Sequence, residues 1–99
     1  MYGLIARLRA VPGKRDELAS ILMAGTTAMP GCLSYIVAAD ASDHDALWIT
    51  EVWSSREKHR SSLMLPAVQQ AIAKGKPLIA SFGERVETEP LGGAGLMTG

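Results

Sequence analysis

The chain is poor in the residues on which several functional classes depend. It holds one cysteine, Cys32, so no internal disulfide can form. No apolar run approaches the ~20 residues of a membrane span, and the N-terminus lacks the basic and apolar regions of a signal peptide. Cys and His do not cluster at metal-ligand spacing, and no glycine-rich loop is suited to cradle a phosphate. We therefore expect a cytoplasmic protein with no membrane partner and no metal, haem or flavin cofactor.

An excess of either charge is also missing. Ten Lys and Arg balance ten Asp and Glu, whereas a nucleic-acid-binding protein would normally carry a basic stripe. Apolar residues make up 47% of the 99 residues and charged residues 20%, which is typical of a folded chain and too apolar for disorder. A chain of this length forms one domain. These values exclude nucleic acid as the expected partner and predict a single globular unit.

The hydrophobic pattern predicts four strands and three helical segments. Strands are expected over Tyr2–Val11, Cys32–Ala39, Ala46–Trp53 and Pro77–Glu87, and helices over Lys14–Met29, Ser54–Leu65 and Pro66–Gly75. The order β-α-β-β-α-β, counting the last two helical segments as one unit, is the ferredoxin-like α+β fold. Its sheet is antiparallel with helices on one face. We expect this domain to cover residues 1–89 and a glycine-rich tail to cover 90–99.

Alternation along the strands assigns side chains to two faces of that sheet. In the first strand Tyr2, Leu4, Ala6, Leu8 and Ala10 share an apolar face, and Gly3, Ile5, Arg7, Arg9 and Val11 share the other. In the last strand the same rule places Leu78, Ala80, Phe82 and Val86 together. Helices cover only one face, so a second subunit is the expected cover for the other. We predict a homodimer that buries more than ~2,000 Å² in total.

The corner after the third strand gathers most of the chemically useful side chains. Alternation puts Leu47, Ile49, Glu51 and Trp53 on one face and Trp48, Thr50 and Val52 on the other. Ser54 and Glu57 have the spacing of a capping box, which predicts a helix start at Ser54 or Ser55. His59 then lies about one turn into the helix. Periodicity does not decide whether its ring faces a cavity or water.

Each candidate has a functional and a structural interpretation. His59 can act as a general base because imidazole titrates near neutral pH, or it can be a partly exposed helix residue. Glu51, next to Trp53, needs a partner if it is buried, and Arg7 and Arg9 are the expected ones, so a structural ion pair competes with a catalytic role.

Aromatic side chains are the candidates for ligand contact. Trp48 and Trp53 can form the walls of a pocket for a flat ligand, although Trp53 at a strand end is more typical of a core residue. The hydroxyl of Tyr35 can donate to a ligand, or the ring can simply pack in the core. Cys32 is expected to be a small core residue and His44 a solvated loop residue.

Two segments resemble the antibiotic biosynthesis monooxygenase domain. Pro30-Gly31-Cys32-Leu33-Ser34-Tyr35 resembles the opening of that family's second strand, and Glu51-Val52-Trp53-Ser54-Ser55-Arg56-Glu57 resembles its Glu-x-Trp-x-Ser-x-Glu signature. The Pro12-Gly13-Lys14 turn also fits, and the resemblance covers residues 2–87. It implies a dimeric α/β barrel. Known members include cofactor-independent oxygenases of aromatic polyketides and quinols, haem-degrading enzymes and stress-response proteins.

The sequence also departs from relatives at informative positions. Many members carry histidines where this chain has Ser62 and Ala67. The Asn, Trp and His of the haem degraders correspond here to Ala6, Ser62 and Ile72, which argues against haem degradation.

The favoured hypothesis is a cofactor-independent monooxygenase acting on a small aromatic, quinol-like or polyketide-like substrate. The expected catalytic residues are His59, Glu51 and Arg7, and the expected substrate contacts are Tyr35, Trp48 and Trp53. The alternatives are a non-catalytic barrel that binds small molecules or responds to stress, and an isomerase on the same fold.

Overall fold

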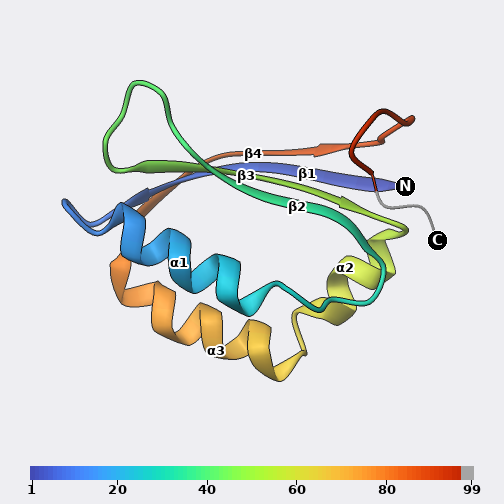
Figure 1. Ribbon diagram of the computed structural model, residues 1–99, viewed down its shortest axis with the longest axis horizontal. Helices are drawn as coiled ribbons and strands as arrows, with labels where there is room; N and C mark the ends of the chain where they lie inside the picture. The colour runs from blue at the N-terminus through green and yellow to red at the C-terminus, as the bar shows by residue number, and fades with distance from the viewer. Residues whose placement is uncertain (97–99) are drawn as a thin grey trace.

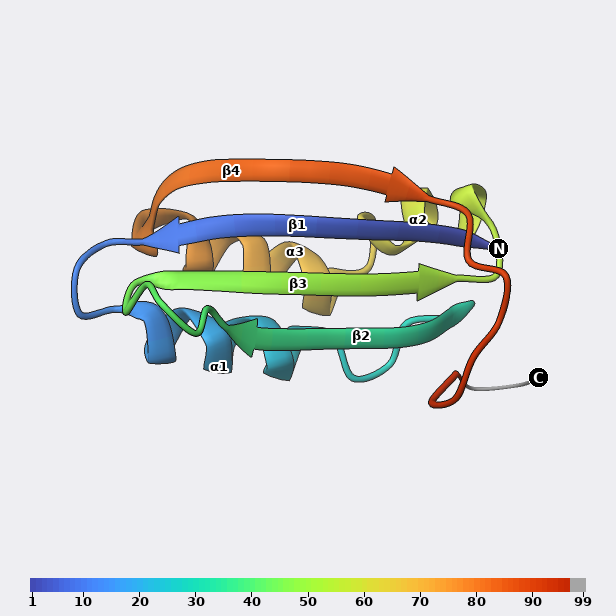
Figure 2. The same ribbon diagram turned by 90° about the horizontal axis from the view of Figure 1, so that it is seen from above.

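A four-stranded antiparallel sheet carries all helices on one face. The computed structural model describes residues 1–96. Figures 1 and 2 show the sheet as one layer and the helices as a second layer beneath it. The strand order is β2-β3-β1-β4. The elements in chain order are β1 (Tyr2–Ala10), α1 (Arg15–Gly25), β2 (Cys32–Ala39), β3 (Ala46–Trp53), α2 (Arg56–Ser62), α3 (Pro66–Gly75), the 3₁₀ turn η1 (Lys76–Leu78) and β4 (Ile79–Thr88). The predicted ferredoxin-like α+β fold is thus confirmed in the form βαββααβ.

The core lies between the sheet and the helices, on the face that alternation assigned to it. Tyr2, Leu4, Leu8 and Ala10 of β1 are all buried. One cluster joins Leu8 to Leu18, Leu47 and Ile49, and a second joins Tyr2 and Leu4 to Trp53. Because β1 and β3 are the two central strands, their inward side chains fix the position of everything beneath the sheet. The predicted inward faces of these two strands are correct.

The first helix is shorter than predicted. Its expected range ran to Met29, but α1 ends at Gly25. The hydroxyl of Thr26 donates to the carbonyl oxygen of Leu22 at 2.7 Å. A threonine side chain that bonds back to the preceding turn competes with the backbone ladder and favours a helix end. The chain then runs through 26–31 as a connection that forms part of the site described below.

The start of α2 follows the predicted position but not the predicted cap. Ser55 is the N-cap residue, and its Oγ accepts a hydrogen bond from the backbone N–H of Lys58 at 3.2 Å. The expected box between Ser54 and Glu57 is therefore wrong by one residue. The helix is also shorter than expected, because it ends at Ser62 and α3 begins separately at Pro66. His59 accordingly lies in the middle of a short helix whose start is fixed by Ser55.

A β-bulge changes which side chains of β4 face the helices. Phe82 pairs with Leu8 and Arg85 pairs with Ala6, so three residues of β4 span two residues of β1. An extra residue in one strand shifts the alternation beyond it. Phe82 therefore shares the helix-facing side with Leu8, whereas Val86, opposite Ile5, lies on the other side. The prediction that Phe82 and Val86 share a face is wrong.

The second face of the sheet carries apolar side chains that the helices do not cover. Alternation places Ile5, Trp48, Val52 and Val86 on this open face, together with Ile36, whose side chain is 55% exposed. The β2–β3 loop rises on the same side (Figure 1). The homodimer expected to cover this face stays a prediction, as does the division into a domain over 1–89 and a tail over 90–99. Of the tail, residues 97–99 lie outside the described residues.

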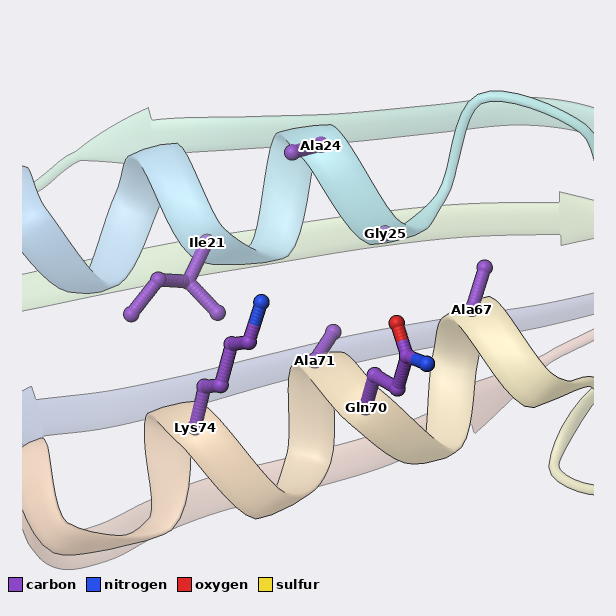
Figure 3. Close-up of a pocket in the computed structure, with 7 residues that line it drawn as sticks. All are labelled: Ile21, Ala24, Gly25, Ala67, Gln70, Ala71 and Lys74. Atoms are coloured by element: carbon purple, nitrogen blue, oxygen red, sulfur yellow. The ribbon is translucent and has the colours of Figure 1, made fainter.

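Helices α1 and α3 approach closely through small residues. A Cβ atom added to Gly25 would lie 2.4 Å from the Cβ of Ala71 and 3.0 Å from the carbonyl oxygen of Ala67. Figure 3 shows these residues beside Ala24, Gln70 and Lys74, around a notch of about 120 Å³ between the two helices. The notch opens on the helical layer's outer side and gathers no acid–base pair. It is a consequence of small-residue helix packing.

Gly25→Leu is expected to lower the free energy of unfolding by about 2–3 kcal/mol, because overpacking at a tight contact forces the two helices apart. Ala24→Leu is the matched control. Ala24 is exposed, so the same side chain there should change stability by no more than about 0.5 kcal/mol. Urea unfolding followed by circular dichroism measures both variants. Equal stabilities of the two variants would contradict the tight contact.

Candidate functional site

A small cavity lies between the sheet and the helical layer, at the end of the molecule where β3 meets α2. Its volume is about 140 Å³, and we call it the inner cavity. Its lining is largely apolar and contains few chemically active groups. The lining residues are Leu22, Thr26, Met29, Tyr35, Glu51, Trp53, His59, Ser62, Leu63, Val68, Ala71 and Ile72. Four of the six residues predicted for the site, Tyr35, Glu51, Trp53 and His59, thus line one cavity.

Glu51 is held at this cavity by contacts that the sequence did not suggest. Its Oε1 accepts a hydrogen bond from Trp53 Nε1 at 3.0 Å and lies 3.8 Å from His59 Nε2. The side chains of Glu51 and His59 are only 11% and 15% exposed. Burial raises the pKa of Glu51, while the Trp53 hydrogen bond and the positive charge of Arg85 act in the opposite direction. A carboxyl group and an imidazole are therefore paired in a site largely closed to water.

The ring of His59 faces the cavity and is fixed by two aromatic neighbours. Its centroid lies 5.3 Å from that of Tyr2 and 5.5 Å from that of Trp53, with the Trp53 contact edge-on. Burial, followed by the positive charge of Arg85, lowers the pKa of His59, and the charge of Glu87 raises it in part. The lowered pKa favours the neutral imidazole, which is the form that a general base requires.

A second polar group lies on the outer side of His59. The hydroxyl of Tyr2 donates to Glu87 Oε2 at 2.8 Å, and Arg56 Nη2 forms an ion pair with the same oxygen at 3.1 Å. The guanidinium of Arg56 also lies over the Tyr2 ring, 5.2 Å from its centroid. The Tyr2 hydrogen bond lowers the pKa of Glu87 most strongly, with Arg56 and Arg85 contributing. This group ties the first and last strands to α2 and holds His59 from outside.

The remaining two predicted site residues, Arg7 and Trp48, lie on the opposite face of the sheet. Arg7 pairs with Asp40 at 3.4 Å and with Asp43 at 3.1 Å, and Trp48 Nε1 donates to Asp40 Oδ2 at 2.8 Å. The backbone N–H of Ser42 and then the Trp48 indole lower the pKa of Asp40 to about 2. The expected ion pair of Glu51 with Arg7 or Arg9 is therefore wrong, because the two arginines lie on the other face of the sheet from Glu51. Arg9 pairs with Asp43 at 3.4 Å instead. Arg7 and Trp48 instead anchor the β2–β3 loop.

The other residues singled out from the sequence have plain structural roles. Cys32 packs against the cluster of Tyr2, Leu4 and Trp53, and burial raises the pKa of its thiol, which makes it a poor nucleophile. His44 is exposed in its loop, as predicted. Burial also raises the pKa of Tyr35, so its hydroxyl stays protonated and able to donate.

Several site residues were missed from the sequence. Tyr2 and Glu87 are 85 positions apart and meet only because β1 pairs with β4. Ser62 lines the cavity, but its Oγ donates to the carbonyl oxygen of His59 at 2.6 Å and so supports the helix rather than facing a ligand. The sequence did carry a signal for the contact between Glu51 and His59, because the two residues are eight positions apart across a strand-to-helix corner. Its contact depends on the rotation of α2, which the sequence pattern left undetermined.

Among residues 1–96, no three His, Cys, Asp or Glu side chains gather closely enough to hold a metal ion. Over the same residues, every helix is too short or too polar to cross a membrane.

The geometry defines a class of site: a small pocket with a largely apolar lining, a half-buried imidazole of lowered pKa beside a buried carboxyl group, and a phenol that can donate. Such a set can bind a flat ligand, remove a proton and stabilise the resulting anion. The family model for antibiotic biosynthesis monooxygenase matches residues 1–74. The chain belongs to this family.

Solved structures agree with that assignment. A protein from Chloroflexus aurantiacus, provisionally named an antibiotic biosynthesis monooxygenase, is 59% identical, with a TM-score of 0.95 over 97% of this chain and 98% of that one. A protein of Deinococcus radiodurans with the same provisional name is 28% identical, with a TM-score of 0.77 over 99% and 100% of the two chains. A Pseudomonas aeruginosa protein shares the fold at 21% identity, with a TM-score of 0.79 over 92% and 94%. A search of curated protein sequences found no match.

Proposed function

We propose that the protein is a cofactor-independent monooxygenase of a small hydroxylated aromatic substrate. The observation that carries the proposal is the buried contact between His59 and Glu51 at the end of an apolar cavity. Family membership supports oxygen chemistry, and the cavity supports an aromatic ligand. The pair supplies the one proton transfer that such chemistry requires.

The reaction balances without an external reductant. Deprotonation of an electron-rich phenol, or of the CH₂ group of its keto tautomer, gives an anion that passes one electron to O₂. The resulting radical and superoxide combine to form a C–O bond, and the hydroperoxide then loses water to leave a carbonyl group. For a ring CH₂ the sum is R₂CH₂ + O₂ → R₂C=O + H₂O. The protein has only to bind, deprotonate and exclude bulk water.

Each of these tasks is assigned to particular residues of the inner cavity. Neutral His59 takes the proton through a ring nitrogen, and Glu51, 3.8 Å from its Nε2, stabilises the imidazolium that forms. Trp53 holds Glu51 by its indole N–H. Tyr35 donates to the developing oxyanion, and the apolar lining keeps water out. Arg7 and Trp48 have no part in this scheme, since they lie on the other face of the sheet.

Oxygen uptake with an anthrone-type substrate tests the proposal directly. The expected result is stoichiometric uptake of O₂, with one atom of labelled ¹⁸O₂ in the quinone product and one in water, by protein dialysed against a chelator. The alternative is a non-catalytic binding protein, which Ser62 favours because it bonds to the backbone where many relatives have a second imidazole. Binding of the quinone product without any turnover of anthrone-type or naphthol-type substrates would support that alternative and overturn the enzyme proposal.

The proposed active form is a homodimer whose open sheet faces pack together. The apolar side chains on that face support this arrangement, because a stable soluble monomer rarely leaves so large a patch uncovered. Wild-type protein is expected to sediment as a dimer at micromolar concentration. Ile36→Asp should shift it to a monomer, because an unpaired carboxylate would be buried at the interface. Met23→Asp, on the outer side of α1, is the control and should leave the dimer intact. A monomeric wild-type protein would contradict the proposal.

A further inference from the structure

An apolar groove adjoins the inner cavity on the helix-facing side of β4. Its volume is about 610 Å³. Figure 2 shows β4 at the outer edge of the sheet, beyond α3, and the groove lies between these two elements. Its walls include Leu8 of β1, Ile79 and Phe82 of β4, and residues of α1 and α3. Lys76 and Ser81 are its only polar lining residues, so the groove suits a hydrocarbon and not a charged ligand.

The groove and the inner cavity have a wall in common. Leu22, Ala71 and Ile72 line both spaces. The two spaces are therefore neighbours. A ligand that spans both would place its reactive ring against His59 and the rest of its length past Ile72, in the groove.

The two volumes indicate how a ligand would be divided between these spaces. Ligand pockets usually measure about 300–1,000 Å³. The inner cavity, at about 140 Å³, is below that range, whereas the groove alone is well within it. The acid–base pair of Glu51 and His59 and the hydroxyl of Tyr35 lie in the smaller space, whereas the larger space is lined mainly by apolar side chains. This is the pattern expected for an amphipathic ligand with a compact phenolic head.

Phe82 lines the groove and contributes little to the buried core. Phe82 pairs with Leu8, so its ring lies on the helix-facing side, where the residue is 76% exposed. Large exposed aromatic rings beside a concave apolar surface commonly mark a binding site. Leu8 belongs to the buried core, whereas Phe82 lies at the surface and its main contact is with the groove.

We propose that the substrate carries an extended apolar arm on its phenolic ring, that the arm lies in the groove, and that Phe82 determines the preference for it. The identity of the head rests on the proposed function. The arm is inferred from the groove and can be tested without turnover.

Equilibrium dialysis of 2-alkyl-1,4-naphthoquinones, with arms of zero, four or eight carbons, tests the arm. These quinones are the products expected from the matching 1-naphthols and need no reaction in order to bind. Each methylene buried in the groove should tighten binding about three- to fourfold until the groove is filled. Phe82→Ala should remove most of this dependence on arm length and leave affinity for the armless quinone within about twofold. Met23→Ala, another exposed apolar residue away from both spaces, should behave as wild type.

The outcomes separate the arm from the proposed reaction. Affinity that rises with arm length in wild type and not in Phe82→Ala supports the arm, even if no naphthol is turned over. Turnover of armless 1-naphthol with affinities independent of arm length keeps the monooxygenase and overturns the arm. Independence of arm length in the dimer combined with dependence in the monomeric Ile36→Asp variant assigns the groove to the second subunit and also overturns it.

Discussion

Replacement of His59 by alanine is expected to reduce turnover of an anthrone-type substrate by on the order of 10²-fold or more. His59 is the neutral base within the inner cavity, and the groups beside it, Glu51 and Trp53, cannot replace it. Burial raises the pKa of Glu51, but its Oε1 is engaged by the Trp53 indole. The fold and the dimer should be unaffected, because the ring is bounded by other side chains and supplies no backbone contact. Initial rates of O₂ uptake at saturating substrate measure the effect.

The pH profile gives the same prediction a second readout. The active form is the free imidazole, so kcat/KM should fall as the pH drops through the pKa of His59. Because burial and Arg85 lower that pKa, the acidic limb should lie below the ordinary value of about 6.5. In the alanine variant this limb should disappear from the residual activity.

His44 supplies the matched control, because it is the other histidine and is exposed in the β2–β3 loop. His44→Ala should leave both the rate and the pH profile unchanged. Undiminished O₂ uptake by His59→Ala, on a substrate that the wild type oxidises, would remove His59 from the mechanism and direct attention to Glu51 and Tyr35.

Trp53→Ala is expected to have the largest effect on stability, about 3–5 kcal/mol of the free energy of unfolding. The Trp53 side chain is 1% exposed, packs with Tyr2 and Leu4, contacts His59 edge-on and donates to Glu51. Its removal leaves a large void and a buried carboxyl group without its donor. A domain of this size has only about 5–15 kcal/mol of stability, so a substantial fraction of the variant should be unfolded at 37 °C. Urea unfolding followed by far-UV circular dichroism measures the loss.

Trp53→Phe separates packing from hydrogen bonding. It keeps an aromatic ring in the core and removes the donor to Glu51, so we expect a loss of about 1–2 kcal/mol. Because the hydrogen bond to Trp53 favours the ionised form, its removal should raise the pKa of Glu51 further. An alanine variant within about 1 kcal/mol of wild type would show that Trp53 is not the core residue described here.

Local patterns in the sequence were enough to predict the elements and their order. Apolar alternation in β1 and β3 identified the buried face correctly, since both strands lie in the middle of the sheet and one side of each is packed. The same rule failed in β4, where the bulge between Phe82 and Arg85 shifts the alternation. An edge strand tolerates such an irregularity because only one neighbour constrains its register, and nothing in the local composition marks it.

The candidate site was predicted only in part, because local sequence patterns group neighbouring residues but do not show contacts between distant strands. Residues on adjacent elements, Glu51, Trp53 and His59, could be grouped from the strand-to-helix corner. Arg7 was assigned wrongly as a partner of Glu51, because the sign of a charge says nothing about the face on which it lies. The alternation of β1 and β3 already places the two on opposite faces. Tyr2 and Glu87 could not be grouped at all, since their contact requires the pairing of the first strand with the last.

The exposure of Phe82 and Ile72 in the groove has a consequence for how the sequence of this family member can change during evolution. Replacement of a solvent-exposed residue such as Phe82 costs little folding free energy, usually within about 0.5 kcal/mol, whereas replacement of a core residue such as Leu18 or Trp53 costs several times more. Mutations at the exposed positions of the groove can therefore accumulate without loss of the folded protein. If the groove selects the substrate, selectivity can drift widely among close relatives while the buried pair of His59 and Glu51 is retained.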